Sequence, residues 1–132
     1  MRSTLGRERR ALGGHGEALA AQFLSEKGYT ILKRNYTCRL GEVDIVAYDR
    51  KHEQLVFVEV KTRRGISQGT PEEAAHPRKM QKVHRAAMWL LARNPKFGEN
   101  YRFDMVAIVM HHAATSKKPH EIRHYEHIPF QD

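Results

Sequence analysis

The sequence predicts an α/β fold in which a mixed sheet is covered by helices. Two stretches space their apolar residues as a helix does, and five others are rich in β-branched or alternating apolar residues. The segment FDMVAIVM is almost entirely apolar, so we expect a strand that is covered on both faces. The order helix, three strands, helix, two strands fits a sheet packed between helices better than a helical bundle or a β-sandwich.

The length and the N-terminal composition predict one domain with a basic extension. A chain of 132 residues has one hydrophobic core, since chains divide into several cores only when they are about twice as long. Residues 1–12 contain several arginines without apolar periodicity, so we expect a flexible basic arm there. Residues 13–132 form the predicted single domain.

The first predicted helix covers residues 15–27. Ala20 and Leu24 follow Glu17 at helical spacing, and Gly28 provides the usual C-terminal stop. Three strands are predicted to follow as a meander, with the sequences YTILKRNYTC, GEVDIVAYD and LVFVEVKTRR. Because only the polar turn DRKHEQ separates the last two, we expect them to pair in antiparallel fashion.

A second helix is predicted from Pro77 to about Arg93, because proline fits the first helical turn. Its apolar residues recur at intervals of three or four on one side. Three basic residues share another side of this helix: Arg78, Lys82 and Arg85. Two strands complete the fold, over residues 103–110 and 121–128.

The charge balance indicates a polyanionic partner. Lysine and arginine number 23 against 15 acidic residues, which gives a formal net charge of +8 and makes nucleic acid the leading class. No apolar run approaches the roughly 18 residues of a membrane span, and the N-terminus lacks a secretory signal, so we expect a cytoplasmic protein without a membrane partner. The single Cys38 allows no internal disulfide.

Three charged residues occur where apolar ones would be expected. Glu59 and Lys61 lie two residues apart in an otherwise apolar strand, so they share a face about 6.6 Å apart at roughly 3.3 Å per residue. In the preceding strand, the meander can bring Asp44 beside Glu59. Buried ionised groups cost several kcal/mol each unless they have partners. The carboxylate pair is therefore suited to a hard cation, Mg²⁺ or Mn²⁺, and Lys61 to the positioning of a water.

Each of the three residues also has a simpler interpretation when taken alone. Glu59 and Lys61 could form a cross-strand ion pair on a solvated face, and Asp44 could be a surface acid near a turn. Their joint occurrence on adjacent apolar strands favours a metal site.

The paired motifs resemble a known family. GEVDIVA at residues 41–47, followed by FVEVKTR at residues 57–63, closely resembles the signature of the YraN family of uncharacterised bacterial proteins. The two motifs are also similar to those of archaeal Holliday junction resolvases and of the wider PD-(D/E)xK nuclease superfamily. The resemblance covers Gly13 to about Ile108 and implies a restriction-endonuclease-like αβββαβ core.

The resemblance also implies roles for individual residues. Asp44 and Glu59 would ligate the metal with the backbone carbonyl of Val60, and Lys61 would serve the attacking water. Glu17 matches an acid on the first helix of family members, where it would hold a second metal or a water. From the residues alone, Glu17 is equally an acid placed near a helix N-terminus, where the helix dipole favours it.

Basic residues around these motifs are candidates for nucleic-acid contacts. Arg63 and Arg64 leave the strand next to the expected phosphate position. The helical stripe of Arg78, Lys82 and Arg85 is the next candidate, and Gln81 and Lys82 lie where many superfamily nucleases place a polar residue near the site. The His-rich C-terminal region lacks a regular ligand spacing, so we interpret it as solvated loop and edge strand.

Together these features predict a divalent-metal-dependent endonuclease that hydrolyses phosphodiester bonds of DNA, including branched DNA, by direct attack of water. Resemblance to resolvases is compatible with a homodimer, because a four-way junction has two symmetric strands to cut. Two alternatives remain: a non-cleaving nucleic-acid-binding module on a nuclease fold, and an interaction protein with a vestigial site.

Overall fold

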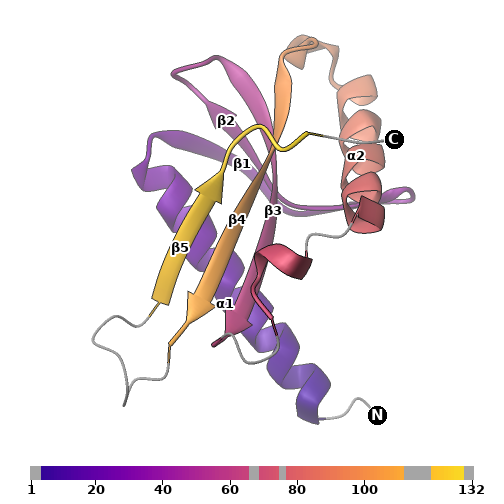
Figure 1. The fold of residues 1–132 in the computed structure, drawn as a ribbon. Helices are drawn as coiled ribbons and strands as arrows, with labels where there is room; N and C mark the ends of the chain where they lie inside the picture. Colours follow the sequence, from indigo (N-terminus) through magenta and orange to yellow (C-terminus); the bar gives the residue numbers. More distant parts are fainter. Residues whose placement is uncertain (1–3, 66–68, 75–76, 112–119, 130–132) are drawn as a thin grey trace.

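A computed structural model describes residues 4–65, 69–74, 77–111 and 120–129 of the chain (Figure 1). Its main elements are, in order, α1 (Thr4–Glu26), β1 (Tyr29–Cys38), β2 (Gly41–Asp49), β3 (Gln54–Arg64), α2 (Pro77–Arg93), β4 (Tyr101–Met110) and β5 (His120–Tyr125). Two short 3₁₀ helices, η1 (Glu72–Ala74) and η2 (Pro95–Phe97), flank α2. The order αβββαβ is the one predicted, and the architecture is α/β, consistent with a restriction-endonuclease-like fold.

The five strands form one mixed sheet in sequence order, β1-β2-β3-β4-β5. The pairs β1–β2, β2–β3 and β4–β5 are antiparallel. For β2–β3, this is the pairing that the short polar turn between the two strands predicts. Strands β3 and β4 are parallel, and α2 lies in the crossover that joins them. The meander prediction is therefore confirmed for the first three strands.

The two helices cover opposite faces of the sheet. Along β3, Val56 and Val58 belong to the core cluster that contains residues of α1, whereas Leu55 and Phe57 belong to the cluster that contains residues of α2. Since successive strand residues point to opposite faces, the alternation separates the two helical layers. Figure 1 shows α1 running diagonally across the sheet.

Two glycines allow the helices to approach the sheet closely. A Cβ atom at Gly16 of α1 would overlap the Thr62 side chain of β3, and one at Gly41 of β2 would overlap the Lys82 carbonyl of α2. Any larger residue would push the helix away from the strand. These approaches hold both helices against the region of the sheet where β2 and β3 carry their charged residues.

Most predicted boundaries agree with the structure, and two do not. Helix α1 begins at Thr4 instead of near residue 15, so residues 4–12 of the predicted basic arm have a helical backbone; residues 1–3 lie outside the described residues. Arginine, leucine, glutamate and alanine are good helix formers, and they extend the helix without apolar periodicity. The last strand ends at Tyr125, before the predicted residue 128.

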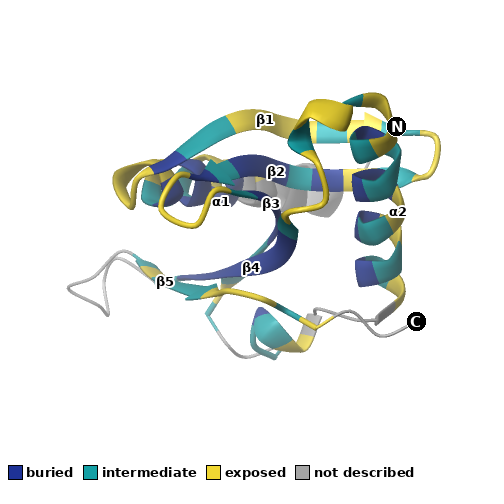
Figure 2. Cartoon of the chain, turned by 90° about the horizontal axis from the view of Figure 1, so that it is seen from above, coloured by how far each residue is buried: buried dark blue, intermediate teal, exposed yellow. Residues whose placement is uncertain are grey.

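Burial follows the predicted pattern of the sheet. Figure 2 shows β2 and β4 largely buried and β1 partly exposed. Strand β4 is buried from Arg102 to Val109, which confirms the prediction of a strand covered on both faces. In the part of the chain that the structure describes, no helix is long and apolar enough to cross a membrane.

Candidate active site

Asp44 lies where the pairing of β2 with β3 stops. The antiparallel ladder runs from Asp49↔Gln54 to Ile45↔Val58, and the same register would next join Asp44 to Glu59. At that point Asp44 Oδ2 accepts a hydrogen bond from the backbone N–H of Val60 at 2.8 Å. The carboxylate thus takes the place of a backbone carbonyl of the ladder, and it is fixed between the two strands.

The faces of β2 change at the same residue. In a regular strand, Val43 and Ile45 would share a face. Instead, Val43 packs in the α2 cluster and Ile45 in the α1 cluster. The alternation is therefore interrupted at Asp44, which accounts for a side chain that turns toward the backbone of β3.

Glu59 is a buried acid whose neighbours only partly satisfy it. It is 3% exposed, and its Oε1 lies 2.7 Å from Lys79 Nζ, an ion-pair distance that does not meet hydrogen-bond geometry. Burial raises the pKa of Glu59, the negative charge of Asp44 raises it further, and Lys79 opposes both, so that the pKa is about 7. The structure thus brings Asp44 and Glu59 together as two mutually repelling carboxylates.

Glu17 approaches the pair from α1. It is 7% exposed, forms an ion pair with Arg34 Nε at 3.4 Å, and keeps its Oε1 without a hydrogen bond. Burial and the charge of Asp44 raise its pKa above the usual value. Because α1 begins at Thr4, Glu17 lies well inside the helix. The interpretation of Glu17 as an acid at a helix N-terminus is therefore wrong.

Lys61 lies on the same strand as Glu59 and is half-buried. Burial lowers the pKa of its ammonium, and repulsion from Lys79 and Arg63 lowers it further against the attraction of the two acids Glu59 and Asp44. A lysine of lowered pKa is easier to deprotonate than an exposed one. It is thus suited to hold or accept a proton beside the carboxylates.

The predicted basic residues near this region differ in how far they are exposed to solvent. Arg63 is half-buried with its Nε lacking a hydrogen-bond partner, whereas Arg64 is exposed at the end of β3. The predicted stripe on α2 is exposed to solvent at all three positions: Arg78, Lys82 and Arg85. Gln81 is half-buried between them.

Lys79 is the residue of the site that the sequence reasoning missed. It precedes Val83, Ala86 and Leu90 at helical spacings, and all three are buried. Lys79 therefore continues the core-facing stripe of α2 as a charged residue. The available signal was a lysine at the end of an apolar stripe, on a different side of the helix from the exposed basic stripe.

The carboxylates of the site fit a hard cation with few protein ligands. Among the described residues, no group of three or more His, Cys, Asp or Glu side chains is close enough to hold a metal ion. Mg²⁺ is commonly bound through one or two carboxylates while it keeps several waters, so the pair Asp44 and Glu59 is a sufficient acidic set for it. The buried Glu17 Oε1 without a hydrogen bond is a further available oxygen.

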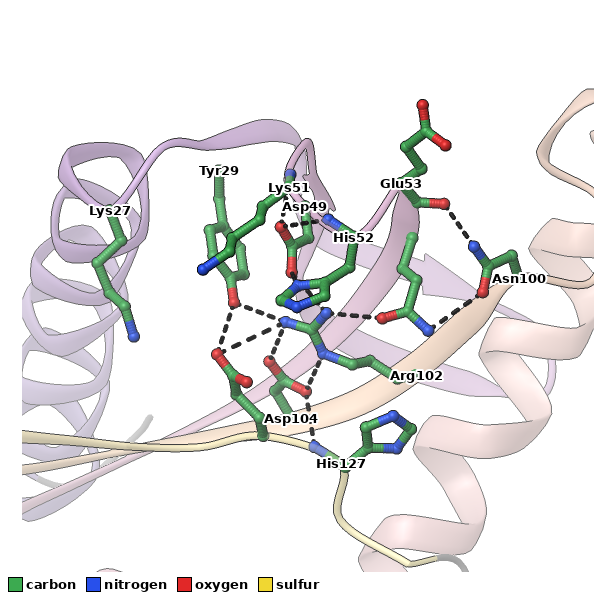
Figure 3. A network of polar contacts seen from close by, with 12 residues as sticks. Lys27, Tyr29, Asp49, Lys51, His52, Glu53, Asn100, Arg102, Asp104 and His127 are labelled. Carbon is green, nitrogen blue, oxygen red and sulfur yellow. Dashed lines mark hydrogen bonds and ion pairs between the residues drawn. The ribbon is translucent and has the colours of Figure 1, made fainter.

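A second charged cluster lies at the other end of β2 and β3 (Figure 3). Arg102 is buried and donates to Asp49 Oδ2 at 2.7 Å, to Asp104 Oδ1 at 3.0 Å and to the Tyr29 hydroxyl at 2.6 Å. His124 lies 2.8 Å from Asp104 Oδ2 with a nearly buried side chain, so the prediction of a solvated His-rich region is wrong at this residue. Residues 112–119 of the predicted His-rich region lie outside the described residues.

Comparison with known proteins relates the chain to uncharacterised bacterial proteins. Residues 16–108 match the model of the uncharacterised protein family UPF0102. The chain is similar to a UPF0102 protein of Pelobacter propionicus, with 40% identity over 124 residues, 94% of this chain and 89% of the relative. It is also similar to UPF0102 proteins of Syntrophomonas wolfei, with 48% identity over 76% of this chain and 86% of the relative, and of Nocardia farcinica, with 46% identity over 78% and 80%.

Proposed function

The chain belongs to the uncharacterised protein family UPF0102, and we propose that it is a divalent-metal-dependent endonuclease that hydrolyses phosphodiester bonds of DNA. One observation carries the proposal: Glu59 is buried beside the charge of Asp44, and its pKa is about 7. A carboxylate pair held at such a cost is a mark of a functional site. The resemblance of the surrounding motifs to PD-(D/E)xK nucleases supports the same assignment.

Asp44, Glu59 and the backbone carbonyl of Val60 are the groups that we propose to hold Mg²⁺ or Mn²⁺. The hydrogen bond from Val60 N–H fixes one oxygen of Asp44, so this ligand is positioned before any ion binds. A divalent ion bound there would polarise a phosphate oxygen and lower the pKa of a nearby water. Glu17 would orient a further water through its Oε1, which accepts no hydrogen bond from the described residues.

Lys61 would position the attacking water and receive its proton. The lowered pKa of its ammonium supports this role, because a proton acceptor works best when its pKa lies near the working pH. Water would attack phosphorus directly while the bond to the leaving oxygen breaks. No covalent intermediate with the protein is needed.

The proposed substrate is DNA, including branched DNA. Arg63 and Arg64 continue β3 beyond Lys61, and the exposed stripe of α2 adds three more positive charges. Such groups contact phosphates without reading bases, and they fix the backbone relative to the carboxylates. For a four-way junction, a homodimer would present one site to each of two symmetric strands.

The test is a cleavage assay on linear, single-stranded and four-way DNA with Mg²⁺, with Mn²⁺ and with a chelator. We expect metal-dependent cleavage by the wild-type protein and its loss in Glu59→Gln and Asp44→Asn. Glu99→Gln is the matched control, because it removes the same charge at an exposed residue away from the site. DNA binding is measured in parallel by fluorescence anisotropy.

The two measurements separate the proposed function from its alternative. If the protein bound DNA but cleaved none of the substrates under any metal condition, it would be a non-cleaving nucleic-acid-binding module. Cleavage that survived in both Asp44→Asn and Glu59→Gln would place the chemistry elsewhere in the molecule.

A further inference from the structure

The Lys79 ammonium lies beside the buried acid Glu59 of the candidate active site. Its Nζ lies 2.7 Å from Glu59 Oε1, and the Glu59 side chain is only 3% exposed. The Lys79 side chain itself is 41% exposed, so it reaches the buried oxygen from solvent. Among the ion pairs of the described residues, Glu59 is paired with Lys79 rather than with Lys61 of its own strand.

The backbone of α2 delivers this ammonium. Gly41 of β2 lies so close to the Lys82 carbonyl that a Cβ atom could not be placed between them. The contact is three residues after Lys79, so the first turns of α2 are held against the sheet. The charge therefore comes from an element that packs tightly, while the four-carbon stem of lysine leaves its ammonium free to move.

We propose that Lys79 is a displaceable counter-cation. A divalent ion must expel the Lys79 ammonium from Glu59, and the displaced ammonium then pairs with a nucleic-acid phosphate. This inference rests on the proposed function, because it concerns the same site. An ammonium and a divalent ion cannot share Glu59 Oε1 without strong repulsion between like charges. The exposed part of the side chain gives Lys79 a route back to solvent.

The exchange couples metal binding to nucleic-acid binding. Without nucleic acid, the ion pair with Lys79 opposes the entry of a metal ion. A bound phosphate competes with Glu59 for Lys79 and so frees the carboxylate. By linkage, metal and DNA each raise the affinity for the other, and the site takes up its ion chiefly when substrate is present.

The first experiment is a calorimetric titration of Mn²⁺ alone into wild type, Lys79→Met and Arg39→Met at fixed ionic strength. We expect Lys79→Met to bind Mn²⁺ at least about fivefold more tightly than wild type, at the lower end of typical coupling between sites. Arg39→Met is the control, because it removes an exposed charge in the turn that precedes β2, two residues from Gly41. It should bind Mn²⁺ like wild type.

A second variant ties the effect to Glu59. In a Glu59→Gln background, which lacks both the proposed ligand and the ion pair, adding Lys79→Met should give no tighter binding of Mn²⁺ than Glu59→Gln alone. A thermal melt of each variant checks that it is folded. If Lys79→Met does not fold, Lys79→Gln carries the same comparison, since it removes the charge and keeps a polar group at Glu59.

The outcomes separate this inference from the proposed function. Equal or weaker binding of Mn²⁺ by Lys79→Met would overturn the inference and make Lys79 a positioning residue for Glu59. An equal gain in Arg39→Met would also overturn it, because general electrostatics would then explain the effect. If neither wild type nor Lys79→Met bound Mn²⁺, the proposed metal-dependent function would fail.

Discussion

Carboxylates are buried at two ends of the same sheet, and they differ in how fully their oxygens are hydrogen-bonded. At the end where β2 turns into β3, Asp49 and Asp104 receive hydrogen bonds from Arg102, and Asp104 also contacts His124. Near the other end, Glu59 forms an ion pair with Lys79 and Glu17 forms one with Arg34, and neither acid receives a guanidinium hydrogen bond of the kind that Arg102 gives, as far as the described residues go. The first group is satisfied, and the second keeps buried oxygens without hydrogen bonds.

The pKa values follow this difference. Burial alone would raise the pKa of Asp49, but hydrogen bonds from Arg102 and His52 outweigh it and bring the value to about 2. Burial of Glu59 is reinforced by Asp44, and its pKa is about 7. Removing the partner of a satisfied buried charge is costly, whereas a buried acid with a raised pKa is a candidate functional group.

The largest effect is expected when the satisfied cluster is broken. Arg102→Met leaves Asp49 and Asp104 buried without their main partner, so we expect a loss of about 3–5 kcal/mol in the free energy of unfolding. Glu59→Gln removes a repelling charge, so its effect should stay within about 1 kcal/mol of wild type. Urea denaturation measures both. Equal losses in the two variants would remove the distinction between the clusters.

The two clusters should also respond oppositely to pH. The lowered pKa values of Asp49 and Asp104 contribute stability above about pH 4, and this contribution is lost as the pH falls toward 2. Glu59 binds its proton more tightly when folded, so stability should fall as the pH rises from 4.5 toward 7.

Glu59→Gln isolates the second contribution, because histidines that titrate in the same range are common to both proteins. We expect the variant to lose the decline between about pH 4.5 and 7 and to keep the acid-induced loss. Urea denaturation at several pH values tests this difference. Parallel curves for wild type and variant would show that folding does not raise the pKa of Glu59.

A smaller effect is expected from metal. Mg²⁺ or Mn²⁺ at ten times its dissociation constant should stabilise wild type by about 1.4 kcal/mol, which is a few degrees of melting temperature. Asp44→Asn should gain much less. Without metal, Asp44→Asn should be as stable as wild type or about 1 kcal/mol more stable, because the amide oxygen can still accept from Val60 N–H while the repulsion of Glu59 is relieved.

Paired thermal melts of wild type and Asp44→Asn, with and without metal at matched ionic strength, measure this effect. A loss of several kcal/mol in metal-free Asp44→Asn, with neither melt shifted by metal, would place Asp44 with the structural cluster. Asp44 would then stabilise the fold as the carboxylates near Arg102 do, and the two ends of the sheet would not differ in this respect.

The smallest effect concerns the salt dependence of DNA binding. Each phosphate contact contributes about −0.9 to the log–log slope of affinity against salt for duplex DNA. Replacing Arg78, Lys82 and Arg85 by glutamine should therefore flatten the slope. The control replaces three exposed basic residues nearer the other cluster: Arg50, Lys51 and Lys96. If both triple variants changed the slope equally, DNA would have no preference for the end with the strained carboxylates.

Local sequence patterns were sufficient for the elements and for part of the site. Alternation and turn chemistry located β1, β2 and α2 at their observed bounds, because these signals act between near neighbours in the chain. Asp44 and Glu59 were identified because a charge inside an apolar strand is visible in the sequence. Asp104, also an acid in an apolar strand, was overlooked, although it carries the same signal.

What the sequence by itself determined was which residues share an element and, except where β2 is interrupted at Asp44, which residues share a face, since backbone periodicity decides this. Only the tertiary structure decided which charges meet. Lys79 reaches Glu59 because Gly41 lets α2 approach β2, and Arg102 reaches Asp49 because β4 adds beside β3 in parallel. Both pairs join residues far apart in the chain. Their partners depend on packing between elements, which no local pattern encodes.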